Sequence, residues 1–238
     1  RCEKKLEAIL LKVISRGGTI LIPSFAVGRA QSILYLISEI KKTNPKLQHI
    51  PLFLDSPMSI DATKIFCQFT DLHRLNHQQC GQILGSVTYV NSATDSKKIK
   101  DIPGSKIIIS ASGMLTGGRV LHHLKDLGAD EKNGLIMVGY QAEGTRGETL
   151  LKEKNKHEVK VHGEMIDVKM ELFFLSTLSS HADQKEIFQW CQALPQKPEL
   201  TLLVHGETQS LLALKNKLKD EADFKVTIAP YLEEVHLF

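Results

Sequence analysis

The spacing of apolar residues predicts helices that alternate with strands along the first part of the chain. Leucine, isoleucine and valine recur at helical spacing in residues 4–15, and Gly17-Gly18 ends this helix before the β-rich residues 19–23. The strands lack polar alternation, so both faces of their sheet should be covered by helices. The sequence therefore predicts an α/β fold with a doubly wound, mainly parallel sheet. Further helices are expected at 30–41, 60–69 and 118–127, and further strands at 51–55, 87–90, 106–111 and 135–139.

After Gly139 the pattern changes. Residues 158–161 and 165–169 flank His162-Gly163-Glu164, as expected for a hairpin. We place a domain boundary near residue 150. Beyond it the pattern predicts strands at 171–176 and 200–204, helices at 184–193 and 210–219, and short β segments at the end of the chain.

The amino-acid composition limits which binding partners and which cellular compartment the sequence favours. The 238 residues include 30 lysines and arginines against 27 aspartates and glutamates, so a surface for nucleic acid must be a local patch. The four cysteines form no Cys-x-x-Cys pair, which argues against a disulfide framework or a zinc ribbon and favours a reducing cytoplasm. No apolar run approaches the ~20 residues of a membrane span. Because the chain begins in a charged helix without methionine, we expect sequence to precede it.

The loop from Ser110 to Arg119 has the geometry of an anion-binding turn. It follows an apolar strand, precedes a helix and is rich in glycine, and Ser112, Thr116 and Arg119 are candidate donors to phosphate oxygens. It matches neither the Walker pattern nor Gly-x-Gly-x-x-Gly, and a tight strand-to-helix turn explains it equally well.

Other strand-to-helix corners have the same character. Residues 23–29 and 144–148 offer Arg29 and Arg146 as phosphate contacts, with solvated surface arginine as the alternative. Ligands of open parallel sheets bind at such carboxyl ends, so we expect Arg29, Ser112, Arg119 and Arg146 to face a common groove.

The corner at residues 55–59 offers an aspartate and a serine that follow a strand directly. Either Asp55 or Ser56 suits the N-cap of the next helix, and we favour this role for Asp55.

Two histidines stand just after apolar strands, in residues 179–183 and 204–207. His181 and His205 are therefore expected at one sheet edge, as a metal ligand, a general acid or a phosphate contact. The other eight histidines are expected to be structural or solvated: His49, His73, His77, His122, His123, His157, His162 and His236.

Six motifs in this order resemble those of the β-CASP nucleases, a family that includes ribonuclease J and the pre-mRNA 3′-end endonuclease. The resemblance implies zinc-dependent hydrolysis of RNA phosphodiesters, by a β-CASP domain inserted into a metallo-β-lactamase domain with RNA in the cleft between them. It implies the end of a lactamase-like half at 1–16, a β-CASP domain at 17–150 and a C-terminal metallo-β-lactamase/RNA-specificity segment at 151–238. The motifs are residues 17–33, 54–58, 110–118, 139–145, 180–183 and 203–207.

The resemblance also implies roles for single residues. His205 is similar to the last zinc ligand of a two-zinc site, and His181 to the histidine proposed to protonate the leaving oxygen, with Ser180 beside it. The family's His-x-His-x-Asp-His run is absent and is expected N-terminal to Arg1. Asp183 and Glu207 are expected to orient neighbours or to cap the helices that follow.

The leading hypothesis is the RNA-binding and partial active-site portion of a zinc-dependent ribonuclease, with endonucleolytic cleavage favoured. Alone, the chain is expected to be inactive. Its expected partners are single-stranded RNA, the N-terminal lactamase-like half and, through an uncovered apolar sheet face, a second copy. A non-catalytic RNA-binding module is the alternative. A small-molecule phosphate or nucleotide enzyme is disfavoured, since no known glycine fingerprint is present.

Overall fold

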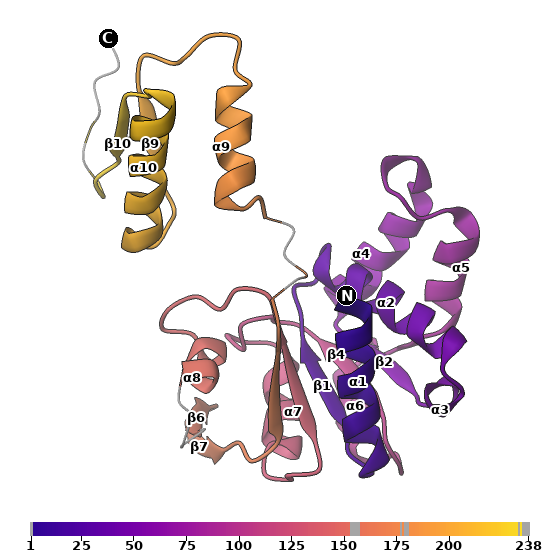
Figure 1. The fold of residues 1–238 in the computed structure, drawn as a ribbon. Helices are drawn as coiled ribbons and strands as arrows, with labels where there is room; N and C mark the ends of the chain where they lie inside the picture. The colour runs from indigo at the N-terminus through magenta and orange to yellow at the C-terminus, as the bar shows by residue number, and fades with distance from the viewer. Residues whose placement is uncertain (1, 153–157, 177, 179–180, 233, 235–238) are drawn as a thin grey trace. The chain divides into compact units, whose positions relative to one another are not determined.

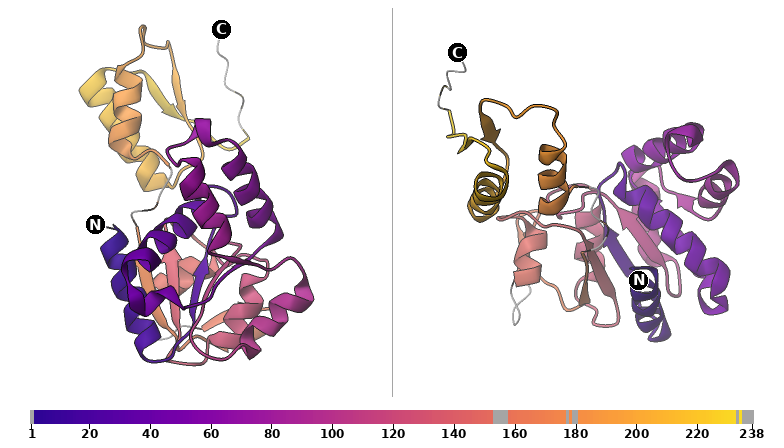
Figure 2. Two further views of the ribbon diagram at one scale, coloured as in Figure 1. Left: turned by 90° about the vertical axis from the view of Figure 1, so that its right-hand side faces the viewer. Right: turned by 45° about the horizontal axis from the view of Figure 1, so that its top comes forward.

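The structure, a computed structural model, describes residues 2–152, 158–176, 178, 181–232 and 234. The chain forms two compact units, residues 1–180 and residues 181–238, and each is described by itself. Figures 1 and 2 show the elements of both units.

A six-stranded sheet forms the centre of the first unit. Its order is β3-β2-β4-β1-β5-β8, and every neighbouring pair is parallel. Parallel neighbours need crossover connections, which helices supply here. The predicted doubly wound α/β fold is therefore confirmed. The strands are β1 (Ile20–Pro23), β2 (Leu52–Asp55), β3 (Thr88–Tyr89), β4 (Ile107–Ser110), β5 (Gly134–Val138) and β8 (Glu171–Leu175).

Helices cover both faces of the sheet because successive strand residues point to opposite sides. Ile20 and Ile22 of β1 join one buried cluster, and Leu21 between them joins another. The first cluster includes residues of α1 (Cys2–Ser15), α2 (Arg29–Thr43), α3 (Pro45–Gln48), α4 (Pro57–Gln68) and α5 (His77–Gly85). The second includes residues of α7 (Val120–Leu127), α8 (Arg146–Lys152) and β6 (Glu158–Val161).

The predicted hairpin is present as β6 and β7 (Glu164–Asp167), which pair antiparallel. Its two turn residues, His162 and Gly163, have φ values of 48° and 88°, as a tight hairpin turn of the primed type requires. After the hairpin the chain returns to the main sheet, where β8 lies beside β5. The two compact units are divided at residue 180, whereas the sequence places a boundary near residue 150, which stays a prediction.

The second unit is small and has its own sheet. β9 (Thr201–Leu203) and β10 (Val226–Ile228) are parallel, and α9 (Gln184–Gln192) and α10 (Thr208–Ala222) complete the unit. Because β8 and β9 belong to different sheets, the expectation that His181 and His205 follow strands of one sheet edge is wrong. The buried core consists of Phe188, Cys191, Leu218, Phe224 and Val226.

The apolar pattern missed four short helices, α3, α5, α6 (Ala93–Lys98) and α8, and at two of them polar caps, not apolar periodicity, mark the start. α5 begins with a capping box between Asn76 and Gln79, and Ser92 caps α6 by accepting from the Asp95 amide. Two 3₁₀ turns, Thr70–Leu72 and Ile99–Asp101, complete this region. None of the helices in the described ranges is both long enough and apolar enough to cross a membrane.

The turn between α1 and β1 passes very close to the start of β5. A Cβ atom on Gly18 would lie 1.9 Å from the carbonyl oxygen of Lys132. By contrast, Gly81 lies within α5, and a Cβ atom there would meet no atom within 4 Å. A methyl group should therefore destabilise the fold at Gly18 but not at Gly81.

We expect Gly18→Ala to lower the free energy of unfolding by at least ~1–3 kcal/mol, because the new methyl group overlaps backbone that cannot move freely. Gly81→Ala is the matched control and should raise it by roughly 0.5–1 kcal/mol, since alanine is the better helix former. Urea unfolding of both variants measures the difference. A neutral Gly18→Ala variant would contradict the close approach.

Candidate functional site

Three loops rich in candidate residues meet at one edge of the first sheet. They follow β4, β1 and β5, which are neighbours in the strand order. The carboxyl ends of parallel strands share an edge, so the loops that carry Arg29, Ser112, Arg119 and Arg146 lie together there. The three loops therefore lie at the same edge of the sheet, as expected. The side chains of the four candidate residues, however, point in different directions.

The loop between β4 and α7 is a tightly closed turn. Ser112 Oγ accepts from the amides of Thr116 (3.1 Å) and Gly117 (3.3 Å) and lies 3.0 Å from Thr116 Oγ1. At Gly118, where φ is 80°, a Cβ atom would lie 2.5 Å from the oxygen of Ala111. The glycines therefore serve the turn itself, while the exposed Thr116 faces outward.

Arg29 is held beneath this edge. Its side chain lies at the start of α2, the residue is 7% exposed, and Nη1 donates to the carbonyl of Val138 at 3.0 Å. Among the described residues, its buried Nε has no acceptor. Burial lowers the pKa of Arg29. A Cβ atom on Gly139 would lie 2.2 Å from Nη1, so glycine leaves the space that the guanidinium fills.

Arg146 ties the loop after β5 to its neighbours. Its Nε donates to the carbonyl of Lys160 (2.5 Å), and its Nη1 donates to that of Leu115 (3.0 Å). Beside it lies a polar pocket of about 370 Å³. Arg29, Ser112 and Arg119 do not line this pocket, so it holds one of the four residues expected to share a groove. Its walls are Thr116, Gly144, Thr145, Arg146, Thr149, Glu158, Val159 and Lys160.

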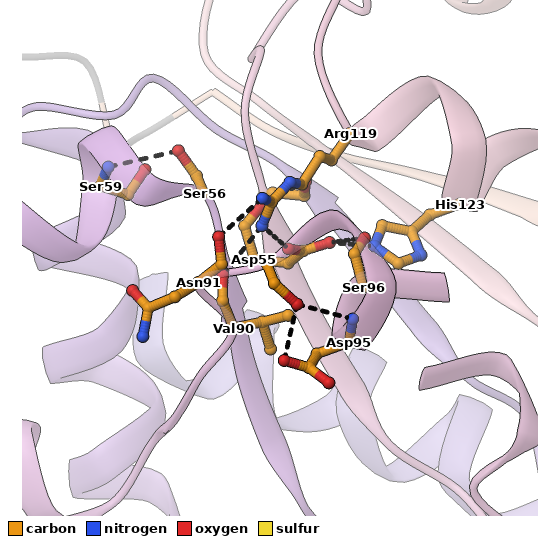
Figure 3. A network of polar contacts seen from close by, with 11 residues as sticks. Asp55, Ser56, Ser59, Val90, Asn91, Asp95, Ser96, Arg119 and His123 are labelled. Carbon is orange, nitrogen blue, oxygen red and sulfur yellow. Dashed lines mark hydrogen bonds and ion pairs between the residues drawn. The ribbon is translucent and has the colours of Figure 1, made fainter. Parts of the chain in front are cut away.

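Arg119 turns toward β2, where it meets a fully buried carboxylate (Figure 3). Nη1 donates to Asp55 Oδ1 at 2.8 Å and to the carbonyl of Val90 at 2.9 Å, and Nη2 donates to that of Asn91 at 2.8 Å. The arginine side chain is 20% exposed and that of Asp55 is 0% exposed. The guanidinium of Arg119 thus links the end of β2 to the residues that follow β3.

Asp55 collects three donors from three segments. Ser96 Oγ donates to Oδ2 at 2.5 Å, and His123 Nε2 lies 2.6 Å from the same oxygen. Since an ionised carboxylate only accepts, the histidine nitrogen carries the hydrogen. Burial by itself would raise the pKa of Asp55, but the hydrogen bonds from His123, Ser96 and Arg119 outweigh burial and lower it.

The network corrects one expectation. Ser56, not Asp55, is the N-cap of α4, because its Oγ accepts from the Ser59 amide at 3.2 Å. Sequence reasoning also gave His123 no partner. His123 lies on the buried side of a strongly amphipathic helix, beside Val120 and Leu124. This position in the apolar pattern could have indicated a buried histidine that needs a polar partner.

The second unit carries His181 and His205. His205 follows β9 in the left-handed region with φ 59°, a conformation that is uncommon for residues other than glycine. Asp183 caps α9 through a capping box with Glu186, as expected. Glu207 occupies the N-cap position of α10 without a capping bond from its side chain. Ser180, the expected neighbour of His181, lies outside the described residues.

A zinc site is not complete in the described part of the chain. Catalytic zinc takes three protein ligands and an open position. Among the described residues, no three histidine, cysteine, aspartate or glutamate side chains gather as a metal-binding group. The donors present here do not fit zinc by themselves.

Comparison with known families decides the assignment. Residues 30–150 match the model of the β-CASP domain. The chain belongs to the β-CASP family of metallo-β-lactamase-fold RNA nucleases. Residues 165–230 match a second model, the Zn-dependent metallo-hydrolase RNA specificity domain. The β-CASP match includes the buried network around Asp55 and the corner with Arg146.

Curated relatives share this order over nearly the whole chain. Ribonuclease TTHA0252 of Thermus thermophilus is 35% identical over 95% of this chain and 52% of its own length. The transcription termination factors FttA of Thermococcus kodakarensis and Pyrococcus horikoshii are 30% and 33% identical, over 99% and 91% of this chain and 37% and 34% of their own lengths. The chain thus spans about half of the Thermus protein and about a third of the archaeal ones.

We expect Asp55→Asn to lower the free energy of unfolding by about 3–5 kcal/mol at pH 7, because it leaves Arg119 and His123 without their buried counter-charge. The folded pKa of Asp55 is lowered. Its contribution is therefore present above the unfolded value of about 3.9 and is lost as pH falls through the folded value. The gap between wild type and variant should narrow below about pH 4.

Denaturant unfolding between pH 3 and pH 7 measures this gap. Asp61→Asn is the control, since that side chain is 73% exposed and 3.8 Å from Lys64. It should change stability by less than about 0.5 kcal/mol at any pH. Equal effects of the two substitutions would show that the buried network does not stabilise the fold.

Proposed function

We propose that this chain is the RNA-gripping and partial active-site portion of a zinc-dependent ribonuclease that cuts RNA phosphodiesters endonucleolytically. The observation that carries the proposal is the tandem order of the two matches, a β-CASP domain followed by the Zn-dependent metallo-hydrolase RNA specificity domain. The Thermus relative is named a ribonuclease, and the archaeal relatives are named transcription termination factors. The first name states cleavage of RNA, and the second states a role in ending transcription.

The RNA backbone binds, in this proposal, along the carboxyl edge of the first sheet. Arg119 and Arg146 are fixed by carbonyl or carboxylate acceptors, and each keeps one nitrogen that no described residue accepts from. Arg29 is assigned to the same edge, where its largely buried charge adds to theirs. A fixed guanidinium loses little side-chain entropy when it meets a phosphate. Ser112 and Thr116 add hydroxyl groups, and Ser180 is assigned to the same RNA contact.

The two histidines of the second unit take the catalytic roles. We assign His205 as one zinc ligand and His181 as the acid that protonates the leaving oxygen, a role that suits an imidazole near neutral pH. Two zinc ions would supply an activated water for the attack on phosphorus. Because the described donors do not complete a zinc site, the remaining ligands are assigned to a lactamase-like half outside these 238 residues.

Several further properties belong to the same proposal. The domain bounds are 1–16, 17–150 and 151–238, the compartment is the cytoplasm, and the chain by itself does not cleave RNA. A second copy is a further partner, through apolar surface that the lactamase-like half would otherwise cover.

A non-catalytic RNA-binding module of the same fold is the second candidate. The absence of a metal-binding group among the described residues favours it. Cleavage of RNA distinguishes the two candidates. The binding module would bind RNA with the same salt dependence as the nuclease portion, but it would not cleave RNA even when joined to the rest of its protein.

The RNA-binding surface is tested with Arg146→Ala. Loss of one phosphate contact should weaken binding to a labelled single-stranded RNA and should reduce the slope of log K against log salt by about 0.7. Lys46→Ala on the exposed α3 is the control and should leave the slope unchanged. Thermal unfolding of Arg146→Ala confirms that the loop is intact. An unchanged slope would remove Arg146 from the interface.

The histidine roles are tested in the protein that carries the complete zinc site. His181→Ala should lower kcat by about 10²–10⁴-fold while the Kd for RNA changes by less than about twofold, because an acid acts in the transition state. His205→Ala should lower zinc content as well as kcat. The control is His49→Ala, an exposed histidine of the first unit. Weaker RNA binding by His181→Ala at unchanged kcat would reassign it as a binding residue.

A further inference from the structure

A second polar pocket lies at the opposite edge of the first sheet, where the strands begin. Its volume is about 280 Å³. The turn before β1, the segment before β4 and the turn before β5 bring Gly17, Lys106 and Lys132 to its wall. In a parallel sheet these amino ends lie at the far side from the loops that carry Arg29 and Arg119.

Lys106 is the unusual residue of this pocket. It is 5% exposed, and no described residue accepts a hydrogen bond from its ammonium nitrogen or forms an ion pair with it. Its backbone is fixed, since its carbonyl accepts from the Ile20 amide at 2.9 Å. Burial, with a smaller contribution from the charge of Lys132, lowers the pKa of Lys106. An ammonium group at the wall of a pocket, without a partner among the described residues, is available to an anion that enters the pocket.

The other charges of the pocket are already paired, and weakly. Lys132 Nζ lies 3.0 Å from Asp130, and Lys100 Nζ lies 3.6 Å from Asp126. These side chains are between 34% and 55% exposed, so solvent screens both pairs and either lysine can turn to another anion. Among the described residues, no counter-charge pairs with Lys106.

The backbone leaves room for a ligand in front of these lysines. Gly17 and Gly104 line the pocket with φ values of 75° and 78°, and a Cβ atom on either would meet no atom within 4 Å. Side chains at these positions would fill this space. The backbone at these two positions therefore leaves open space at the wall of the pocket that Lys106 also lines.

We propose that this pocket binds a small anion with a phosphate group, whose oxygens contact Lys106 and are closed in by Lys132 and Lys100. The volume suits a phosphate with a small attachment, because sites for drug-sized ligands begin at about 300 Å³. A pocket of this volume holds one phosphate group and not a continuous phosphate backbone, so a polynucleotide is disfavoured. Inorganic phosphate and a nucleoside monophosphate share the required chemistry.

The experiment compares wild type, Lys106→Met and Lys64→Met, the last an exposed lysine of α4 in the same unit. Calorimetric titrations use inorganic phosphate and adenosine 5′-monophosphate, with sodium chloride at equal ionic strength as the reference. Lys106→Met should weaken phosphate binding about tenfold or more, because it removes a charge-assisted hydrogen bond. It should also unfold at a higher temperature than wild type without phosphate. Lys64→Met should match wild type in both measurements.

The outcomes separate the sources of the ligand and the ways in which the proposal fails. Tighter binding of the monophosphate identifies a nucleotide, and equal or weaker binding identifies phosphate itself. Lys132→Met provides a second variant, with a smaller loss of affinity expected. The proposal is overturned if phosphate stabilises Lys106→Met as much as wild type, if chloride reproduces the effect, or if RNA competes with phosphate in a Lys106-dependent way.

Discussion

The buried carboxylate of Asp55 fixes how the segments at the carboxyl edge of the sheet meet. A carboxylate with no exposed surface requires hydrogen bonds to every side, and its donors come from α6, α7 and the loop before α7. Its own backbone carbonyl accepts from Ser110 Oγ at 2.8 Å, which adds the end of β4. None of these partners is a close neighbour of Asp55 in sequence, so the network depends on the order of the strands in the folded sheet. The loop with Arg119 and the start of α7 take their positions from it.

The same principle governs the other arginines of this edge. Arg29 and Arg146 each donate to backbone carbonyls of another segment, and each therefore holds a loop in place as well as a positive charge. A site that handles phosphates benefits from charges that are fixed before the ligand arrives, because less side-chain entropy is lost on binding. Structural anchoring and phosphate contact are thus compatible roles for one guanidinium, provided that a nitrogen remains free of acceptors.

The second unit presents its chemistry differently. His205 has a left-handed backbone conformation shortly after the short strand β9, and such conformations persist where the surrounding structure holds them. The unit has a small core of five buried residues and a two-stranded sheet, and the described residues offer no complete metal site. The β-CASP match lies within the first unit, and the match to the RNA specificity domain begins in the first unit and continues into the second.

The sequence by itself determined the parallel α/β sheet, the hairpin after it and the order of motifs that identifies the family. These features depend on local periodicity, turn residues and chain order, all of which are readable along one dimension. Tertiary structure decided which aspartate or serine caps α4, which histidine joins Asp55, and that β8 pairs with β5 while β9 pairs with β10. Those outcomes depend on contacts between residues far apart in sequence, and an apolar strand carries no local mark of the neighbour beside which it will lie.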